Sequence, residues 1–290
     1  MAANANPKPF RDLVDHHRDL FVDPLLWTYR HLDLVGCRFE DVDTTITEST
    51  QDDCRTDDDQ RPSQKLPSNT EQLATNPFPT VKYRCLVNLL VGEGRAFAKI
   101  RSPPLVGYLH YTNVNGDRRR KFEPCPGPNG SLNFIGARIL KIRLAQIAPK
   151  EWTKDPYFVC ILLALAQLQE RKLESSKPIT YTSRLLVTNI SDREYIHFYE
   201  AKISAELLGV LRGPRTTTEY TKWPTIQQRK LPFKPYDTFG DRIMAELVAP
   251  SLCFHETSTM SYDLNGVVEC GIKRPYEQEN NKSHKMKRII

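Results

Sequence analysis

The sequence predicts an α+β protein: a mostly antiparallel sheet packed against a few helices, with a disordered acidic linker and a flexible basic tail. Two stretches alternate side chains as strands do, residues 81–91 and the paired segments within 183–204. Between them, residues 134–148 and 156–168 repeat apolar residues at helical spacing. The third observation is compositional. Residues 41–79 hold almost no large apolar side chain, so burial there cannot offset the entropy of ordering.

Length and composition indicate one main domain with flexible flanks. The chain has 290 residues, of which 39% are hydrophobic, enough for a core if part of the chain stays unstructured. The longest apolar run, Tyr157–Ala166, is about half as long as a membrane span. We therefore expect a soluble protein without membrane contact. Its predicted divisions are a short helical segment (1–40), the acidic disordered linker (41–79), an α+β globular domain (80–254) and the flexible basic tail (255–290).

The charge is distributed unevenly along the chain. Residues 40–59 hold nine acidic residues against Arg55, a local net charge of −8. Because the whole chain has a net charge of +6, the remaining residues sum to +14. Such a body can bind nucleic acid or an anionic partner, with the acidic linker screening that surface. The alternative is an ordinary solvated surface beside a disordered linker.

The elements follow in order along the chain. Residues 10–34 predict one or two short helices that dock on the main domain. The alternation in 81–91 predicts a strand, and residues 105–111 predict another that runs into Asn115-Gly116, a strong hairpin signal. Two helices follow, one ended by Pro149 and one that Asp155 caps, whose nearly continuous apolar residues indicate burial.

Residues 183–204 predict a hairpin with its turn at the sequence SDRE. Its second strand carries apolar side chains on both faces, so we expect it inside the sheet. The two faces are Tyr195, His197 and Tyr199, and Ile196 and Phe198. A short helix over 205–212 and a last helix over about 237–249 complete the domain.

Glu200 and Lys202, two residues apart on the predicted strand, match the E-x-K half of a metal-dependent nuclease site. In such a site two carboxylates bind a divalent ion and the lysine orients the attacking water. The order of elements resembles the core of PD-(D/E)xK nucleases, with Asp192 as the other carboxylate. However, Asp192 lies eight residues from Glu200, roughly 26 Å along an extended strand.

Pairing across the hairpin gives the same result. With the turn centred on Asp192-Arg193, Leu185 lies opposite Glu200 and Ser183 opposite Lys202. The partner strand then supplies no carboxylate, although Asp237 or Asp241 could supply one from elsewhere in the fold. The alternative is a structural Glu/Lys pair at the strand end. A cofactor, Mg²⁺, is expected only if the nuclease alternative holds. No other metal site is expected, because the seven cysteines form no C-x-x-C pair.

Two basic stretches are candidates for binding. Arg118, Arg119, Arg120 and Lys121 precede Phe122, so they could contact phosphates while the aromatic ring stacks on a base; a solvated hairpin arm is the alternative. The tail has Lys273 and Arg274, ten polar residues, then a second cluster. This spacing is similar to a bipartite nuclear import signal, which implies importin-α as a partner and the nucleus as the location. The second cluster is Lys285, Lys287 and Arg288.

Residues 134–250 resemble an uncharacterised family of filamentous-fungal proteins with no assigned activity. The stretches that carry the resemblance are FIGARILKIRLAQIAPKEW, SRLLVTNISDREYIHFYEAKIS and RKLPFKPYDTFGDRI. The resemblance implies a fungal source and no mechanism.

The sequence thus favours a nuclear, non-enzymatic protein that binds nucleic acid or another nuclear protein. One alternative is a PD-(D/E)xK nuclease or a degenerate relative that uses Glu200 and Lys202. A further alternative is a small-molecule enzyme whose site is assembled from residues far apart in the sequence.

Overall fold

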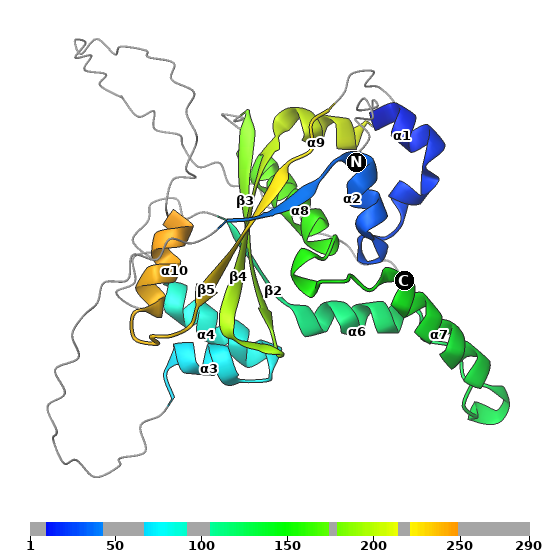
Figure 1. The fold of residues 1–290 in the computed structure, drawn as a ribbon, viewed down its shortest axis with the longest axis horizontal. Coiled ribbons are helices and arrows are strands. Elements are labelled where there is room, and N and C mark those ends of the chain that lie inside the picture. Colours follow the sequence, from blue (N-terminus) through cyan, green and yellow to red (C-terminus); the bar gives the residue numbers. More distant parts are fainter. Residues whose placement is uncertain (1–9, 43–66, 92–104, 174–178, 214–220, 249–290) are drawn as a thin grey trace, which may run out of the picture. The chain divides into compact units, whose positions relative to one another are not determined.

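The computed structural model describes residues 10–42, 67–91, 105–173, 179–213 and 221–248, all within one compact unit of residues 1–249 (Figure 1). The long helices are α4 (Pro79–Val91), α6 (Tyr111–Lys121), α7 (Phe134–Ile147), α8 (Tyr157–Lys172), α9 (Ala205–Arg212) and α10 (Phe239–Val248). Shorter helices are α1 (Phe10–His16), α2 (Tyr29–Val35) and α3 (Asn69–Thr75), with 3-10 turns η1 (Arg18–Phe21), η2 (Pro24–Leu26), η3 (Pro128–Gly130) and η4 (Trp152–Lys154). The strands are β1 (Arg38–Asp41), β2 (Val106–His110), β3 (Thr180–Asn189), β4 (Asp192–Ser204) and β5 (Thr225–Pro232).

The described strands form one sheet in the order β1-β5-β4-β3-β2. The long central pairings, β3 with β4 and β4 with β5, are antiparallel. The short outer pairings, β1 with β5 and β2 with β3, are parallel. The predicted α+β class is confirmed, with a sheet that is mostly antiparallel and has parallel edges. The prediction that the second hairpin strand lies inside the sheet is also confirmed, since β4 is central.

Each face of the sheet carries a hydrophobic core, because residues along a strand point alternately to opposite faces. On one face, Tyr199, Ala201 and Ile203 of β4 pack with α8, α9 and the N-terminal helices. On the other face, Ile196 and Phe198 pack with α3, α4 and α10. Figure 1 shows these helices on opposite sides of the sheet. The N-terminal segment therefore belongs to the same compact unit as the predicted domain.

The prediction of a strand over residues 81–91 is wrong, because this segment is helix α4. Its buried residues follow the helical period, with Lys82 joining an apolar stripe of Cys85, Leu86, Leu89 and Leu90. Of the residues that alternate in the sequence, Tyr83, Val87 and Val91 are exposed, whereas Cys85 and Leu89 are buried. The apolar residues of this segment fit an alternation of every second residue, as in a strand, but the residues that are buried recur about every 3.6 residues, as in a helix.

Two further boundaries differ from those predicted. Asn115 and Gly116 lie inside α6 and do not have the positive φ angles that a tight hairpin turn requires. The predicted linker ends before residue 79, because α3 forms within it. Ser68 caps α3 by accepting a hydrogen bond from the Glu71 amide, and Leu73 is fully buried. Residues 43–66, 92–104 and 249–290 of the predicted linker, turn and tail lie outside the described residues.

Candidate functional site

Glu200 and Lys202 lie on the same face of β4, as predicted, but their partners differ from those expected. Arg184 of β3 is opposite Glu200, and Thr182 is opposite Lys202. The register expected from the sequence is wrong by one residue. An irregularity between Val187 and Asn189, next to the turn, shifts the pairing.

Glu200 is held in a buried ion pair. Only 3% of the residue is exposed, and its Oε2 accepts a hydrogen bond of 2.8 Å from Nε of Arg184, which is also buried. On the other side of β4, Gln227 of β5 is the register partner of Glu200. The pairing thus places a cation at the position from which a nuclease would supply its second carboxylate, and a cation repels a divalent metal.

The residues around Glu200 therefore do not fit a Mg²⁺ site. Mg²⁺ in proteins takes near-octahedral oxygen ligands, usually carboxylates and waters. One oxygen of Glu200 is already committed to Arg184. Among the described residues, no group of three or more His, Cys, Asp and Glu side chains is placed to hold a metal ion. The Arg184–Glu200 ion pair therefore disfavours metal binding by Glu200.

A cavity of about 480 Å³ lies beside this pair, at the end of the sheet near α9. Its lining is chemically mixed and includes two carboxylates, two lysines, hydroxyl groups and an amide. These residues are Thr180, Glu200, Lys202, Ser204, Glu206, Lys222, Trp223, Pro224, Thr225 and Gln227. Such a lining can form hydrogen bonds with a polar molecule. The sequence pattern identified Glu200 and Lys202 but not Lys222 or Glu206, which reach the cavity from other segments.

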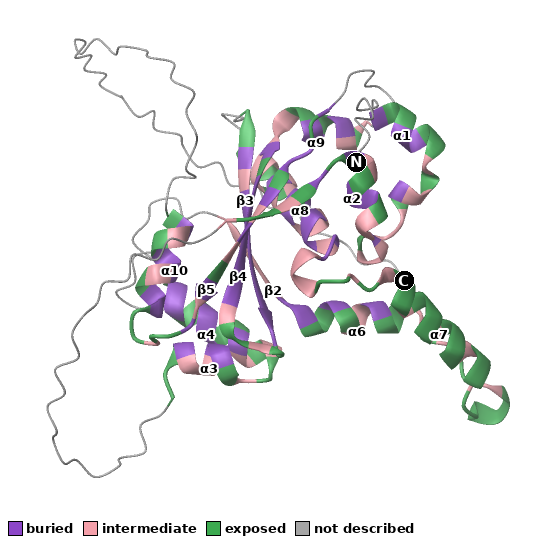
Figure 2. Ribbon diagram, in the orientation of Figure 1, coloured by how far each residue is buried: buried purple, intermediate pink, exposed green. Residues whose placement is uncertain are grey.

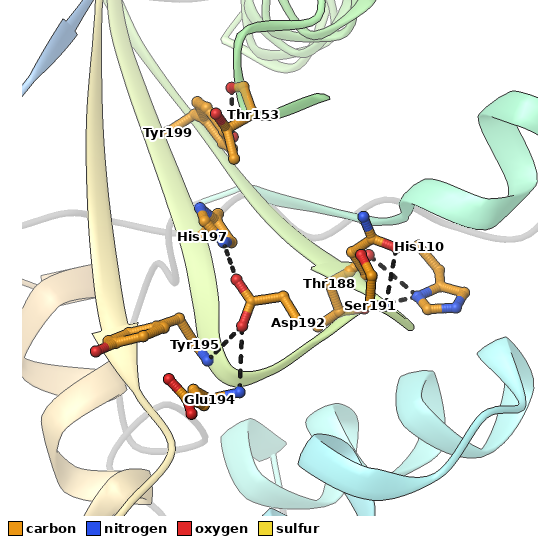
Figure 3. Close-up of polar contacts among 10 residues, drawn as sticks. His110, Thr153, Thr188, Ser191, Asp192, Glu194, Tyr195, His197 and Tyr199 are labelled. Carbon is orange, nitrogen blue, oxygen red and sulfur yellow. Dashed lines mark hydrogen bonds and ion pairs between the residues drawn. The ribbon is translucent and has the colours of Figure 1, made fainter. Parts of the chain in front are cut away.

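Asp192, the other carboxylate of the nuclease hypothesis, has a structural role in the β3–β4 turn. Its Oδ1 accepts hydrogen bonds from the amides of Glu194 and Tyr195 at 3.1 Å (Figure 3). Its Oδ2 lies 2.7 Å from Nε2 of His197. These contacts hold the turn against the buried imidazole, so Asp192 is not available at Glu200.

Two buried histidines flank this turn. His197 packs edge-on against Trp152, and its Nδ1 has no hydrogen-bond partner among the described residues. Burial lowers the pKa of His197, although the nearby Asp192 partly opposes the shift. His110 binds Thr188 through Nδ1, while its Nε2 has no partner in the described part of the chain (Figure 3). Burial and the positive charge of Lys82 lower the pKa of His110. The contacts of both rings connect neighbouring elements: His110 of β2 binds the hydroxyl and carbonyl of Thr188 on β3, and His197 binds Asp192 at the start of β4.

Lys82 is an unexpected buried cation. It is 1% exposed, and its Nζ donates to the carbonyls of Leu73 and Ala74 at 2.5 and 3.1 Å. The lysine thus caps the last turn of α3 from within α4. Burial is the main cause that lowers its pKa to about 8. The sequence offered no signal for this role, because the predicted strand gave residue 82 an ordinary polar position.

The basic run at residues 118–121 does not lie in a hairpin arm. It forms the last turn of α6, where Arg118 is 2% exposed and makes two hydrogen bonds to Asp155, at 2.6 and 2.8 Å. Arg120 pairs with Asp117 and Lys121 pairs with Asp23. Phe122, the expected stacking ring, lies under the guanidinium of Arg143 at 5.6 Å. The prediction that Arg118 contacts phosphates is therefore wrong. Within residues 118–121, Arg119 is exposed and forms no ion pair with the described residues.

Helix α7 forms as predicted but is not covered by the described part of the protein. Asn133 caps it by accepting a hydrogen bond from the Gly136 amide, and none of its fourteen residues is buried. Figure 2 shows the helix exposed along most of its length. Ile135, Ile139 and Ile142 are 77%, 46% and 51% exposed. A concentration of exposed large apolar residues on one helix is typical of an interaction surface.

The tail residues predicted for nuclear import lie outside the described residues, so their role stays a prediction. They are Lys273, Arg274, Lys285, Lys287 and Arg288. In the part of the chain that the structure describes, no helix is both long and apolar enough to cross a bilayer.

The fold and site define a class only broadly: an α+β protein with a mixed five-stranded sheet, a polar cavity and an exposed apolar helix. The chain matches no family model, and no curated protein or solved structure shows significant similarity to it. The resemblance to filamentous-fungal proteins stays a prediction.

Proposed function

We propose that this chain is a nuclear, non-enzymatic protein of a filamentous fungus that binds another macromolecule through α7. The observation that carries the binding role is the exposure of the three isoleucines on this helix. No described residue buries them, although the described part of the chain forms two well-buried cores. A partner that covers them gains the hydrophobic free energy of removing these side chains from water.

The nuclear location is supported by the sequence of the tail. Two basic clusters separated by ten polar residues suit the two acidic sites of importin-α. The acidic residues within 40–59 would modulate contacts of the basic body. The nuclease hypothesis, which requires Glu200 to bind a metal ion, is disfavoured by the Arg184–Glu200 ion pair.

Photo-crosslinking in cells tests the binding role. A photoreactive amino acid replaces Ile142 in the full-length chain, and in a matched control it replaces Arg193, which is exposed near the start of β4. We expect a discrete cross-linked product at position 142 and not at position 193. No product at 142, or the same product at both positions, would contradict the proposal.

Imaging tests the nuclear location separately. A fluorescent fusion of the full-length chain should be nuclear, and replacing Lys285, Lys287 and Arg288 by alanine should disperse it. An intact fusion that stays cytoplasmic in both forms would refute the nuclear role. It would leave the binding role of α7 open to its own test.

A second candidate function, an enzyme acting on a small polar molecule, is favoured by the cavity beside Glu200. Thermal unfolding in the presence of sugar phosphates, amino acids and nucleotides tests it. A ligand that raises the melting temperature of the wild-type protein, but not that of Lys202→Ala, would support this function. If no compound stabilises the wild type, or if one stabilises both proteins equally, the cavity is not the binding site for these classes.

A further inference from the structure

The exposed isoleucines of α7 form a narrow stripe along one side of the helix. Ile135, Ile139 and Ile142 are spaced by four and three residues, the spacing of alternating d and a positions in a coiled coil. A surface helix that packs on a domain core has a wider apolar stripe, whereas the strict a/d stripe is the seam between two helices. The spacing therefore suits another helix as the occupant.

The charges beside this stripe select the kind of helix. With Ile135 at a d position, Arg138 occupies g and Arg143 occupies e, the positions that set partner choice in coiled coils. Lys141 adds a third positive charge, and α7 contains no acidic residue. Arg138 and Lys141 are exposed and form no ion pair with the described residues. A partner with Glu at its own e and g positions would complement these charges.

A second copy of the chain fits poorly for the same reason. Two α7 helices, in either direction, would bring arginines at e and g positions together, and like charges at these positions are destabilising. Nucleic acid would satisfy the arginines but has no apolar helix face to bury three isoleucines. An anionic lipid surface favours a broad apolar face, whereas Arg138 and Arg143 flank the isoleucines of α7 on both sides.

We propose that α7 binds an acidic amphipathic helix of a partner protein through the seam Ile135–Ile139–Ile142, with Arg138 and Arg143 pairing with its glutamates. This inference rests on the proposed binding function and names the chemistry of the partner. Because the seam covers only about two heptads, the expected complex is reversible, and its affinity depends on salt.

Fluorescence anisotropy with two labelled probe peptides tests the proposal on the full-length chain. Both probes have four heptads with leucine at a and d; one carries glutamate at every e and g position, the other lysine. The wild-type protein should bind the glutamate probe, and more weakly as salt rises. The lysine probe should not bind. If the glutamate probe does not bind, or if both bind equally, the proposal fails.

Three variants locate the binding. Ile139→Glu should weaken the glutamate probe by roughly tenfold or more, because a charge then occupies the seam. Ala137→Glu adds the same charge at an exposed f position and should change affinity by less than about threefold. Arg138→Glu should weaken the glutamate probe and allow the lysine probe to bind. Equal binding by Ile139→Glu and wild type would overturn the seam. All three positions lie on an unburied helix, and circular dichroism checks that each variant folds.

Two controls separate the other occupants. Sedimentation of the wild type as a dimer that Ile139→Glu dissociates would show that a second copy covers the seam. Binding to phosphatidylserine vesicles without binding of the glutamate probe would show a lipid surface. If neither probe binds but the cross-link at position 142 forms in cells, the binding function stands and the acidic-helix inference is wrong.

Discussion

Replacing Arg118 with alanine removes the cation from a buried ion pair that joins α6 to the start of α8. The guanidinium donates two hydrogen bonds to Asp155 and a third, of 2.8 Å, to the carbonyl of Leu25. Asp155 is fully buried. In the variant, Asp155 still accepts hydrogen bonds from the hydroxyl of Tyr111 and the amide of Tyr157, but the positive charge of Arg118 that balanced its own charge is gone.

The magnitude follows from this imbalance. Removing one partner of a buried ion pair costs about 3–5 kcal/mol, because the remaining charge stays in a medium of low polarity. The unfolding free energy of a whole protein is typically about 5–15 kcal/mol. We therefore expect Arg118→Ala to lose at least a fifth of its stability, and up to most of it.

Urea unfolding, followed by tryptophan fluorescence and far-UV circular dichroism, measures this loss. Trp27, Trp152 and Trp223 all lie in the folded unit and report on it. The matched control is Arg119→Ala, in which the neighbouring exposed arginine is removed and stability should change by less than about 0.5 kcal/mol. If Arg118→Ala lies within about 1 kcal/mol of the wild type, the assignment of Arg118 to a structural ion pair is refuted.

Three other predictions concern Glu200, the buried histidines and Lys82. Any nuclease activity measured with Mg²⁺ should be unchanged in Glu200→Gln, which keeps a hydrogen-bond acceptor for the buried Arg184, because Arg184 opposes a metal ion there. The unfolding free energy should fall as pH decreases below about 6.5, the ordinary pKa of histidine, because burial lowers the pKa of His110 and His197 and only the unfolded chain gains these protons at first. The unfolding free energy should also rise by about 3 kcal/mol between pH 8 and 10.5 because of Lys82. The pKa of Lys82 is about 8 in the folded protein and 10.5 in the unfolded chain, so within this range the unfolded chain binds more protons. The rise is complete when Lys82 is neutral in both the folded and the unfolded state.

Each of these predictions has a control. A Mg²⁺-dependent activity lost in a folded Glu200→Gln variant but kept in Glu206→Gln would return the nuclease hypothesis to first place. The acid-side loss should diminish when His110 and His197 are both replaced by glutamine, and an unchanged pH profile would contradict the assignment. The alkaline rise should be absent in Lys82→Met, so a rise of equal size in both proteins would show that other groups cause it.

The hairpin of β3 and β4 could be predicted because its signals are local. Alternating side chains identify both strands, and two apolar faces place the second strand inside the sheet. The predicted turn at Asp192-Arg193 is wrong, because the turn residues are Ile190 and Ser191 and β4 already begins at Asp192. The register could not be predicted, since the irregularity between Val187 and Asn189 leaves no mark in the alternation of side chains. Because the register differs by one residue from the predicted one, Arg184 rather than Leu185 lies opposite Glu200.

Other features were beyond sequence reading because their partners are distant. Arg118 looks like its exposed neighbours, yet its partner, Asp155, lies 37 residues further along the chain. Lys82 looks like a surface lysine until α3 packs against α4. The parallel edges of the sheet also join segments far apart in sequence, whereas local patterns favoured antiparallel neighbours. The exposure of α7 likewise follows from the lack of a covering element among the described residues, which its own periodicity does not show.

The edge strand β1 has a consequence for the order in which the protein folds during synthesis. Its described partner is β5, and the thiol of Cys37, next to β1, donates to the carbonyl of Pro224, 187 residues later. At about 5–20 residues per second, a ribosome needs on the order of 10–40 s to make the intervening chain. Strand β1 must therefore wait for its strand partner until the nascent chain has delivered β5. The N-terminal helices can pack earlier, because α6 and α8, which contact η2, are made before β5.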